Sequence, residues 1–457
     1  MERGKGDSIR RVDVTRTLEI LKEHVTQALC KAAFKTVRTT ERQRRWSLKA
    51  LVQFWTAVIL RAPASLSHAL SEMRDGREPL VPRIQATDEA FFERCRDFSW
   101  KFFREVFSRF IKGLVRLAKP RFCAPLAGLR ERFTDVVLID GSRVAAIAHK
   151  LKILWNERAV VLPGCLLVVY DLFRGIPRIL EFSVDAAAGE LTRAKKVLTR
   201  IKRGTLIVGD RLYSMGAFFE ELRQKRLWGL FRRNRRMGLH RLGRKPLRKK
   251  RWKGGLLTEW LVNAGSGVSA PVQKLRLIRW TSGRTVHELL TNVLDSKRLM
   301  AEEAMDLYPW RWRIERMFYD LKEVLNLNRV YAANPNAVGM QVYAAAMVYA
   351  AMRVAQGDVA GQCRIEPEEI STEKFFPKMA AACHDFTIAE YTVDEMIRMN
   401  PGKRLKRPRW KGRRFTTINL DDIRVRRRNG ARRHRRFCKA RCQWKSITHL
   451  RGGRELS

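Results

Sequence analysis

The segment FTDVVLIDG, residues 133–141, decides the fold class of this chain. It is a run of aliphatic and β-branched residues that ends in Asp140 and a glycine, which is typical of a short buried strand. A second run, TLIVGD at residues 205–210, ends in Asp210 in the same way. Because two strands can deliver their last residues to one edge of a sheet, these two aspartates are candidate site residues. An Asp after a strand is also a common turn or cap residue, so neither is convincing alone.

The segments around these two strands favour an α/β domain. Arg174 and Gly175 separate two apolar runs, as in a β-hairpin. The predicted elements in chain order are a strand at 133–140, a strand pair at 163–173 and 177–186, a helix at 191–202, a strand at 205–210, a helix at 215–227 and a strand at 228–234. This order predicts a mixed sheet with flanking helices.

The regions on either side of this pattern have a different character. Apolar residues recur at helical spacing up to about residue 130, with Thr87 as a plausible helix start. We divide the chain into a helical region at 1–130, the first part of the sheet domain at 131–234, a basic β-rich insertion at 235–300, further helices at 301–395 and a basic tail at 396–457. The tail has too few apolar residues for a core, so we expect a flexible arm that binds nucleic acid.

Composition and charge limit the classes of function. The 457 residues include 93 Lys and Arg against 46 Asp and Glu, a net charge of +47, and 45% of residues are hydrophobic. Such a chain can build a core, and its charge predicts a polyanion as partner, first of all a nucleic acid. The most apolar segment, residues 337–355, contains Gln341 and ends near Arg353, so we interpret it as a buried core helix and expect no membrane partner.

The N-terminus and the cysteines favour a protein of the cytoplasm. Basic residues near the start are not followed by an apolar segment of the kind found in secretory signals. The eight cysteines are scattered through a long chain, which suggests reduced thiols rather than a disulfide framework. His434, Cys438, Cys442 and His449 could form a zinc cluster, but a plain basic tail is the better interpretation.

A third candidate acid lies in YPWRWRIERMFYDLK, residues 308–322. On a continuous α-helix, five residues would share one face: Tyr308, Arg311, Glu315, Phe318 and Lys322. In isolation this face would be an ordinary solvated one with an i,i+4 ion pair. The spacing of these residues, and their position after two strand-terminal aspartates and a basic insertion, favour a functional role for this face.

In this order and spacing the sequence resembles the DDE transposases of bacterial insertion sequences, in the fourth insertion-sequence family with its Y-R-E-K signature. The motifs that carry the resemblance are LIDGSRV, IVGDRLY and YPWRWRIERMFYDLK, within about residues 130 to 350. The resemblance implies an RNase H-like core interrupted by a β-rich insertion. It also implies that the helical first 130 residues recognise the DNA ends, although no motif matches there, and the very basic tail departs from the family pattern.

The resemblance further implies the site residues. Asp140, Asp210 and Glu315 would be the catalytic triad and bind two divalent ions, Mg²⁺ or in its place Mn²⁺, since hard oxygen ligands favour such ions. Tyr308, Arg311 and Lys322 would hold phosphates of the element's end. Arg211, directly after Asp210, is a further candidate for DNA binding or for packing of the strand end.

The function that follows is transposition of an insertion sequence. The protein would bind terminal inverted repeats of double-stranded DNA, cleave at the repeat and transfer the freed strand to target DNA, as a homodimer at the bacterial nucleoid. The alternatives are a catalytically inactive, transposase-derived DNA-binding protein, a metal-dependent nuclease of another class and an RNA-binding protein. Nucleases of another class usually group their acids in one short hairpin, and no RNA-binding motif is evident here.

Overall fold

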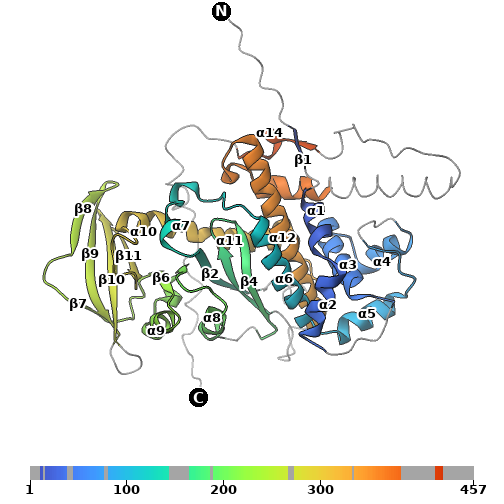
Figure 1. Cartoon of the computed structure of the whole chain (residues 1–457), viewed down its shortest axis with the longest axis horizontal. Coiled ribbons are helices and arrows are strands. Elements are labelled where there is room, and N and C mark those ends of the chain that lie inside the picture. Colours follow the sequence, from blue (N-terminus) through green and yellow to red (C-terminus); the bar gives the residue numbers. More distant parts are fainter. Residues whose placement is uncertain are drawn as a thin grey trace, which may run out of the picture.

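The computed structural model describes residues 11–13, 16–38, 45–76, 81–143, 164–185, 189–265, 272–331, 334–381 and 417–425. Figure 1 shows the helices of the N-terminal region gathered at one end of the molecule around the long helix α12, with strands β7 to β10 at the opposite end. The N-terminal helices are α1 (Arg16–His24), α2 (Gln27–Lys35), α3 (Leu48–Arg61), α4 (Leu66–Arg74), α5 (Asp88–Asp97) and α6 (Lys101–Leu117). The predicted helical character of this region is confirmed.

The predicted start at Thr87 is the N-cap of α5, where its side-chain hydroxyl accepts a hydrogen bond from Ala90 N–H. The periodic run that follows is divided into two helices, because α5 ends at Asp97 and α6 begins at Lys101. Two short turns, η1 (Ala124–Leu126) and α7 (Leu129–Arg132), lead from these helices into the sheet.

The centre of the molecule is a mixed sheet with the order β4-β3-β2-β5-β6. Strand β2 pairs antiparallel with β3, which pairs antiparallel with β4, whereas β5 and β6 run parallel to β2. The bounds are β2 (Val136–Arg143), β3 (Cys165–Asp171), β4 (Ile176–Ser183), β5 (Leu206–Gly209) and β6 (Trp228–Arg232), with helices α8 (Glu190–Leu198) and α9 (Gly216–Gln224) between them. This is the predicted element order, and the predicted mixed sheet with flanking helices is confirmed.

Both faces of this sheet are buried, as the unbroken apolar runs require. Along β2, Val136 and Leu138 face the core formed with the N-terminal helices and α12, while Val137 and Ile139 face the core formed with α8 and α9. This alternation follows from the two-residue period of a strand. The ends of β2 and β5 therefore lie between two helical layers.

The basic segment before Glu315 extends the sheet. Strand β11 pairs antiparallel with β6, and the order continues β11-β10-β9-β7, with β8 paired to β9. The bounds are β7 (Leu239–Arg241), β8 (Arg248–Trp252), β9 (Gly255–Ala264), β10 (Gln273–Ser282) and β11 (Thr285–Thr291). The strands expected here are present, and they continue the central sheet through β6.

The most apolar segment forms helix α12 (Pro335–Cys363), which is capped by Asn334, whose side chain accepts from Ala337 N–H. The helix is long and apolar enough to span a membrane by composition, but its apolar window is entirely buried inside the fold. Small residues allow close packing, and at Gly339 an added Cβ would lie 2.6 Å from the Trp100 side chain. The interpretation as a buried core helix is confirmed.

One part of the basic tail is folded. Strand β12 (Thr417–Asn419) pairs with β1 (Arg11–Asp13), and the short helix α14 (Leu420–Ile423) follows it. Ile423 is fully buried, and Ser371 N–H donates to its carbonyl. Residues 417–425 therefore do not belong to a free arm as expected, because they cover the segment that follows α12. The residues of the zinc hypothesis lie outside the described residues.

Candidate active site

The pairing of β2 with β5 brings the two predicted aspartates together. Leu138 and Val208 are partners in this parallel pair, and Asp140 and Asp210 each lie two residues further along. Asp140 is still within β2, where its Oδ1 accepts from Gly141 N–H. Asp210 caps the short helix η3 (Arg211–Tyr213) and accepts from Leu212 N–H at 2.7 Å. Both carboxylates thus lie at the same edge of the sheet.

The sequence predicts one helix around Glu315, but the chain forms three short helical segments here. After α10 (Ala301–Leu307) the chain forms the 3-10 turn η4 (Tyr308–Arg311), the helix α11 (Trp312–Tyr319) and the π-helical turn η5 (Asp320–Val324). Pro309 lies in the first turn, where its missing N–H and fixed φ are compatible with helical structure. Helix α11 packs against β2 and η4 against β5, which aims this segment at the two aspartates.

Arg311 links two of the three acids. Its Nη1 lies 3.3 Å from Asp140 Oδ2 and its Nη2 2.7 Å from Glu315 Oε1. The Arg311 side chain is only 7% exposed, whereas that of Glu315 is 36% exposed. The guanidinium therefore forms a buried bridge between the carboxylates of β2 and α11.

The other signature residues also lie at this edge. Lys322, on the π-helical turn, donates to Ser142 Oγ at 2.9 Å, and burial lowers the pKa of its ammonium. Burial raises the pKa of Tyr308, which lies close enough to Arg311 for the guanidinium to oppose that rise. Arg211 is exposed on the turn that Asp210 caps. The structure thus places Arg311 and Lys322 near Asp140, and Tyr308 and Arg211 near Asp210.

Charge repulsion and burial act on Asp140 together. Burial raises the pKa of its carboxyl group to about 7, against the opposing effect of Arg311. The negative charges of Glu190, Asp210 and Glu315 add to this rise. Burial and the neighbouring acids together therefore outweigh the stabilisation of the charged form by Arg311.

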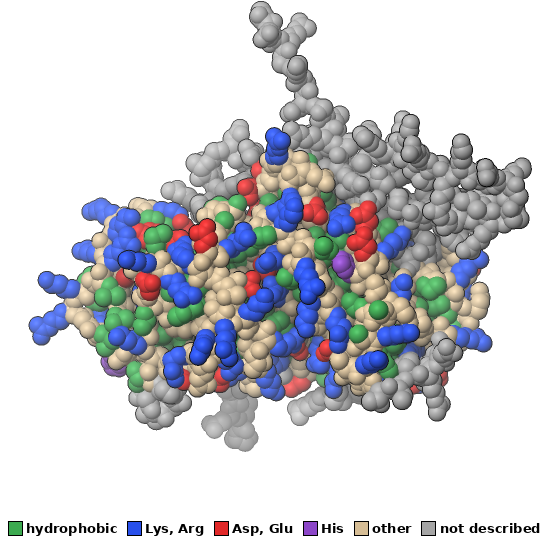
Figure 2. Space-filling view, viewed as in Figure 1, with side chains coloured by type: hydrophobic (Ala, Val, Ile, Leu, Met, Phe, Trp, Pro, Cys, Tyr) green, Lys and Arg blue, Asp and Glu red, His purple; other side chains and the backbone are tan. Residues whose placement is uncertain are grey.

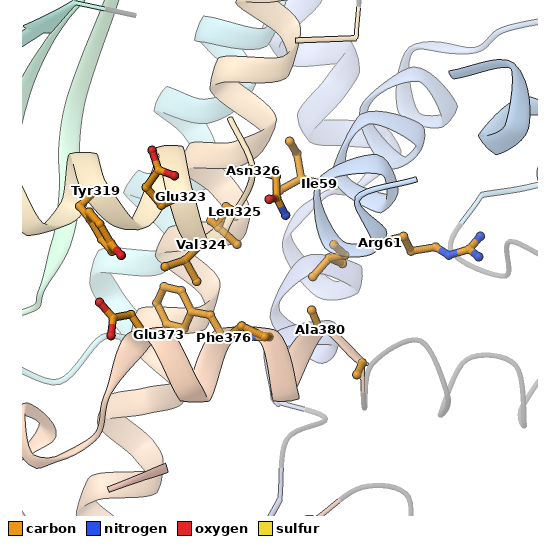
Figure 3. Close-up of a pocket in the computed structure, with 13 residues that line it drawn as sticks. Ile59, Arg61, Tyr319, Glu323, Val324, Leu325, Asn326, Glu373, Phe376 and Ala380 are labelled. Carbon is orange, nitrogen blue, oxygen red and sulfur yellow. The ribbon is translucent and has the colours of Figure 1, made fainter. Parts of the chain in front are cut away.

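A hollow of about 420 Å³ opens over these residues and is lined by Asp140, Gly141, Ser142, Glu315, Phe318, Tyr319, Lys322 and Glu323. A second hollow, of about 610 Å³, lies between the end of α3, η5 and the helix at 372–381. Figure 3 shows that Tyr319 and Glu323 also border this second hollow and that the Arg61 side chain extends away from it. The two hollows therefore meet along the face of α11 and η5.

The donor set at this edge suits a hard divalent cation. Asp140, Asp210 and Glu315 offer only carboxylate oxygens, the ligands that Mg²⁺ prefers. Among the described residues, no three side chains of Asp, Glu, His or Cys converge closely enough to form a ligand cluster. Arg311 lies between Asp140 and Glu315 and supplies the positive charge that pairs with both carboxylates.

Positive charge is spread over the surface around the site. Figure 2 shows Lys and Arg side chains scattered across the described part of the visible face, with fewer acids between them. At the far end of the sheet, the exposed basic residues of β8 and the turn after it are Arg248, Lys249, Lys250, Arg251 and Lys253. A long polyanion could therefore contact the protein well beyond the acidic edge.

Three residues near the acids do not emerge from the sequence as site residues. Ser142 lies in LIDGSRV, but its contact with Lys322 depends on where the π-helical turn falls. Tyr213 lies in IVGDRLY, where the motif alone suggests no more than packing or contact with DNA; its hydroxyl donates to Glu190 Oε1 at 2.5 Å. Glu190 is the first residue of α8, and in the sequence nothing distinguishes it from an ordinary acid at the start of a helix.

The central region of the chain is similar to known proteins. Residues 132–351 match the family of transposase DDE domains. A Sinorhizobium fredii protein named as transposase y4zB is 28% identical over 193 residues, which are 41% of this chain and 52% of that protein. A Synechocystis protein named as a transposase for insertion sequence element IS4SA is 31% identical over 110 residues, 23% of this chain and 32% of that protein.

The chain thus spans about half the length of the first of these curated relatives and a third of the second. A solved structure of the piggyBac transposase synaptic complex with hairpin DNA aligns with a TM-score of 0.42 and 11% identity, covering 86% of this chain and 87% of that chain.

Proposed function

Residues 132–351 of this chain belong to the transposase DDE domain family, and on that premise we propose that the protein is the transposase of an insertion sequence, which cuts and joins DNA at the acidic edge of its sheet. The family match confirms the resemblance to DDE transposases, and membership of the fourth insertion-sequence family is consistent with the relatives found. The proposed substrates are double-stranded terminal inverted repeats and target DNA, bound by a homodimer that brings two ends together at the bacterial nucleoid.

One observation carries this proposal: Asp140 and Asp210 lie level on the parallel strands β2 and β5, and Glu315 is bridged to Asp140 by Arg311. These three acids would hold two Mg²⁺ ions, for which Mn²⁺ can substitute, and when bound the ions would stabilise the attacking and leaving oxygens of the phosphodiester. The acids themselves provide the oxygen donors and fix them on rigid strands and a packed helix.

The basic residues at the same edge would hold the DNA. Lys322 on η5 and Arg311 on η4 flank Glu315, so each can contact phosphates next to the bond that is cut. Tyr308 lies beside Arg311 and restricts its position, and Arg211 is exposed next to Asp210. The charges of Lys322, Arg311 and Arg211 would fix the register of the duplex, and the wider basic surface would add affinity without sequence preference.

The test is cleavage of a labelled duplex that carries the element's own terminal repeat, with Mg²⁺ or with EDTA. We expect nicking at the repeat boundary in Mg²⁺, its loss in Glu315→Gln, Asp140→Asn and Asp210→Asn, and DNA binding that is largely kept in all three. Glu323→Gln, which changes an exposed acid on the rim of the same hollow, serves as the control and should cleave normally.

Binding without nicking in any metal would favour an inactive, transposase-derived DNA-binding protein. Metal-dependent cutting that survives all three substitutions would favour a nuclease whose acids lie elsewhere. Either result would contradict the proposed role of the triad.

A further inference from the structure

A fourth carboxylate, that of Glu190, lies against the end of β2. An added Cβ on Gly141 would be only 2.3 Å from Glu190 Oε2 and 3.0 Å from Oε1. The glycine directly after Asp140 therefore makes room for this acid. Since Glu190 begins α8, it approaches from the helical layer opposite to that of α11 and Glu315.

Glu190 also connects the two aspartate motifs. Its Oε1 accepts a hydrogen bond of 2.5 Å from the hydroxyl of Tyr213, three residues after Asp210. The Tyr213 side chain is fully buried and packs on Phe218 and Phe231, so its hydroxyl is a fixed donor. The carboxylate of Glu190 is thereby held beside Gly141 and near the turn that Asp210 caps.

The position of Glu190 is not explained by helix stability alone. An acid in the first turn of α8 interacts favourably with the helix dipole, typically by less than about 1 kcal/mol, and does so equally well when it faces solvent. Here it lies against the residue next to Asp140, whose carboxylate is itself partly buried. Close carboxylates repel each other unless they share a cation.

We propose that Glu190 is a fourth carboxylate of the divalent-cation site, held in place by Tyr213 and admitted by Gly141. The proposal rests on the function proposed above, because it assumes that Asp140 and Asp210 bind divalent cations. It assigns to α8 a direct part in a site otherwise built from β2, β5 and α11.

The experiment follows cation binding without DNA and without turnover. The full-length protein is freed of metal, and its melting temperature is measured as Mn²⁺ or Mg²⁺ is added. Glu190→Gln keeps an acceptor for the Tyr213 hydroxyl but removes the charge, and we expect it to raise the cation concentration at half-maximal stabilisation at least about tenfold. Tyr213→Phe keeps the charge and removes the donor, so it should raise that concentration less than Glu190→Gln does.

Two further variants serve as a control and as a second test of the effect of Glu190→Gln on cation binding. Glu323→Gln, on the rim of the hollow, should leave the half-maximal concentration unchanged. Glu190→Asp keeps the charge on a shorter side chain, gives an intermediate value and provides a second test if Glu190→Gln does not fold.

Three outcomes would overturn the proposal. If Asp140→Asn abolishes stabilisation by the cation but Glu190→Gln responds like the wild type, Glu190 is outside the site and the proposed function stands. If Tyr213→Phe and Glu190→Gln weaken the response equally, Glu190 acts only by positioning the turn. If the wild-type protein itself shows no response to either cation, both this inference and the metal-dependent function fail.

Discussion

Asp140 is held where its charged form is unfavourable, and this gives a prediction about stability without metal. Its pKa is raised from 3.8 to about 7 in the folded chain, so the folded state keeps a proton that the unfolded state loses as the pH rises. The free energy of unfolding therefore falls between about pH 4 and pH 7 on account of this group. Asp140→Asn removes that decrease and should raise the melting temperature in EDTA by about 3 to 10 °C at pH 8.

The same substitution should have little effect at about pH 3, below both pKa values, where Asp140 is mostly protonated in both states. Thermal unfolding at the two pH values measures the difference, with Glu323→Gln as the exposed control. An equal effect of Asp140→Asn at both pH values would contradict this account of its pKa.

Gly141 is predicted to be required for steric reasons. Gly141→Ala would place a methyl group against the Glu190 carboxylate, and we expect the free energy of unfolding in urea to fall by about 1 to 3 kcal/mol. The double variant with Glu190→Ala should regain most of this stability, because the clash is removed. Gly238→Ala is the control, since an added Cβ there meets nothing within 4 Å. A Gly141→Ala protein as stable as the wild type would show that Glu190 moves aside freely.

At the residue scale, the sequence is informative about acids that end strands and less so about their neighbours. Asp140 and Asp210 follow apolar runs, and the structure places them level at one edge. Glu190 could not be found in this way, because its approach depends on how α8 packs across the sheet. The Lys322 contact with Ser142 is hidden for the same reason, since it spans 180 positions of sequence.

At the scale of elements, the signature segment shows what helical periodicity can and cannot predict. Periodicity predicts one helix from about residue 302 or 308 to about residue 327, yet within it the chain changes from a 3-10 turn to an α-helix to a π-helical turn. At the π turn, Asp320 is buried, pairs with Arg316 one turn earlier and accepts a hydrogen bond from Thr372. Thr372 belongs to the segment after α12, so the local pattern of apolar residues carries no sign of this contact.

Helix α12 is joined to the β3–β4 hairpin by a buried arginine. Arg353 donates to the Gly175 carbonyl and to Gln356 Oε1, and its guanidinium lies 4.1 Å from the centre of the Phe122 ring. Arg353→Met keeps much of the volume but removes the donor to Gln356 Oε1 and leaves the Gly175 carbonyl with the Tyr170 hydroxyl alone. We expect the free energy of unfolding to fall by about 1 to 3 kcal/mol, measured by urea denaturation.

Arg116→Met, which changes an exposed arginine of α6, is the matched control and should alter stability by less than about 0.5 kcal/mol. Similar stabilities of the two variants would mean that Arg353 does not hold the hairpin to α12.

At the scale of the whole molecule, one sheet connects the acidic edge with the basic end. The strands of the insertion are predictable from their composition, but their continuation of the central sheet depends on the pairing of β11 with β6, which is non-local. Because β6 pairs with β5, and β5 with β2, the basic strand β8 is rigidly placed relative to Asp140 and Asp210. A duplex that contacts both ends would thus be oriented by a single rigid layer.

The tail offers a test that separates folding from DNA binding. A chain ending at Val425 keeps β12 and α14 but lacks residues 426–457, with twelve Lys and Arg and one Glu. We expect its melting temperature to be unchanged and its affinity for duplex DNA to fall. The slope of log affinity against log salt should become shallower by about 0.9 for each phosphate that the tail no longer neutralises.

A chain ending at residue 416 also lacks the buried Ile423 and the ion pair of Asp422 with Lys378, so its melting temperature should drop as well. Since strand β1 then has no partner strand, the N-terminal segment should also become more accessible to protease. If the chain ending at Val425 bound DNA with the affinity and salt dependence of the full chain, the surface of the folded part alone would account for binding. The charge of the tail would then need another explanation.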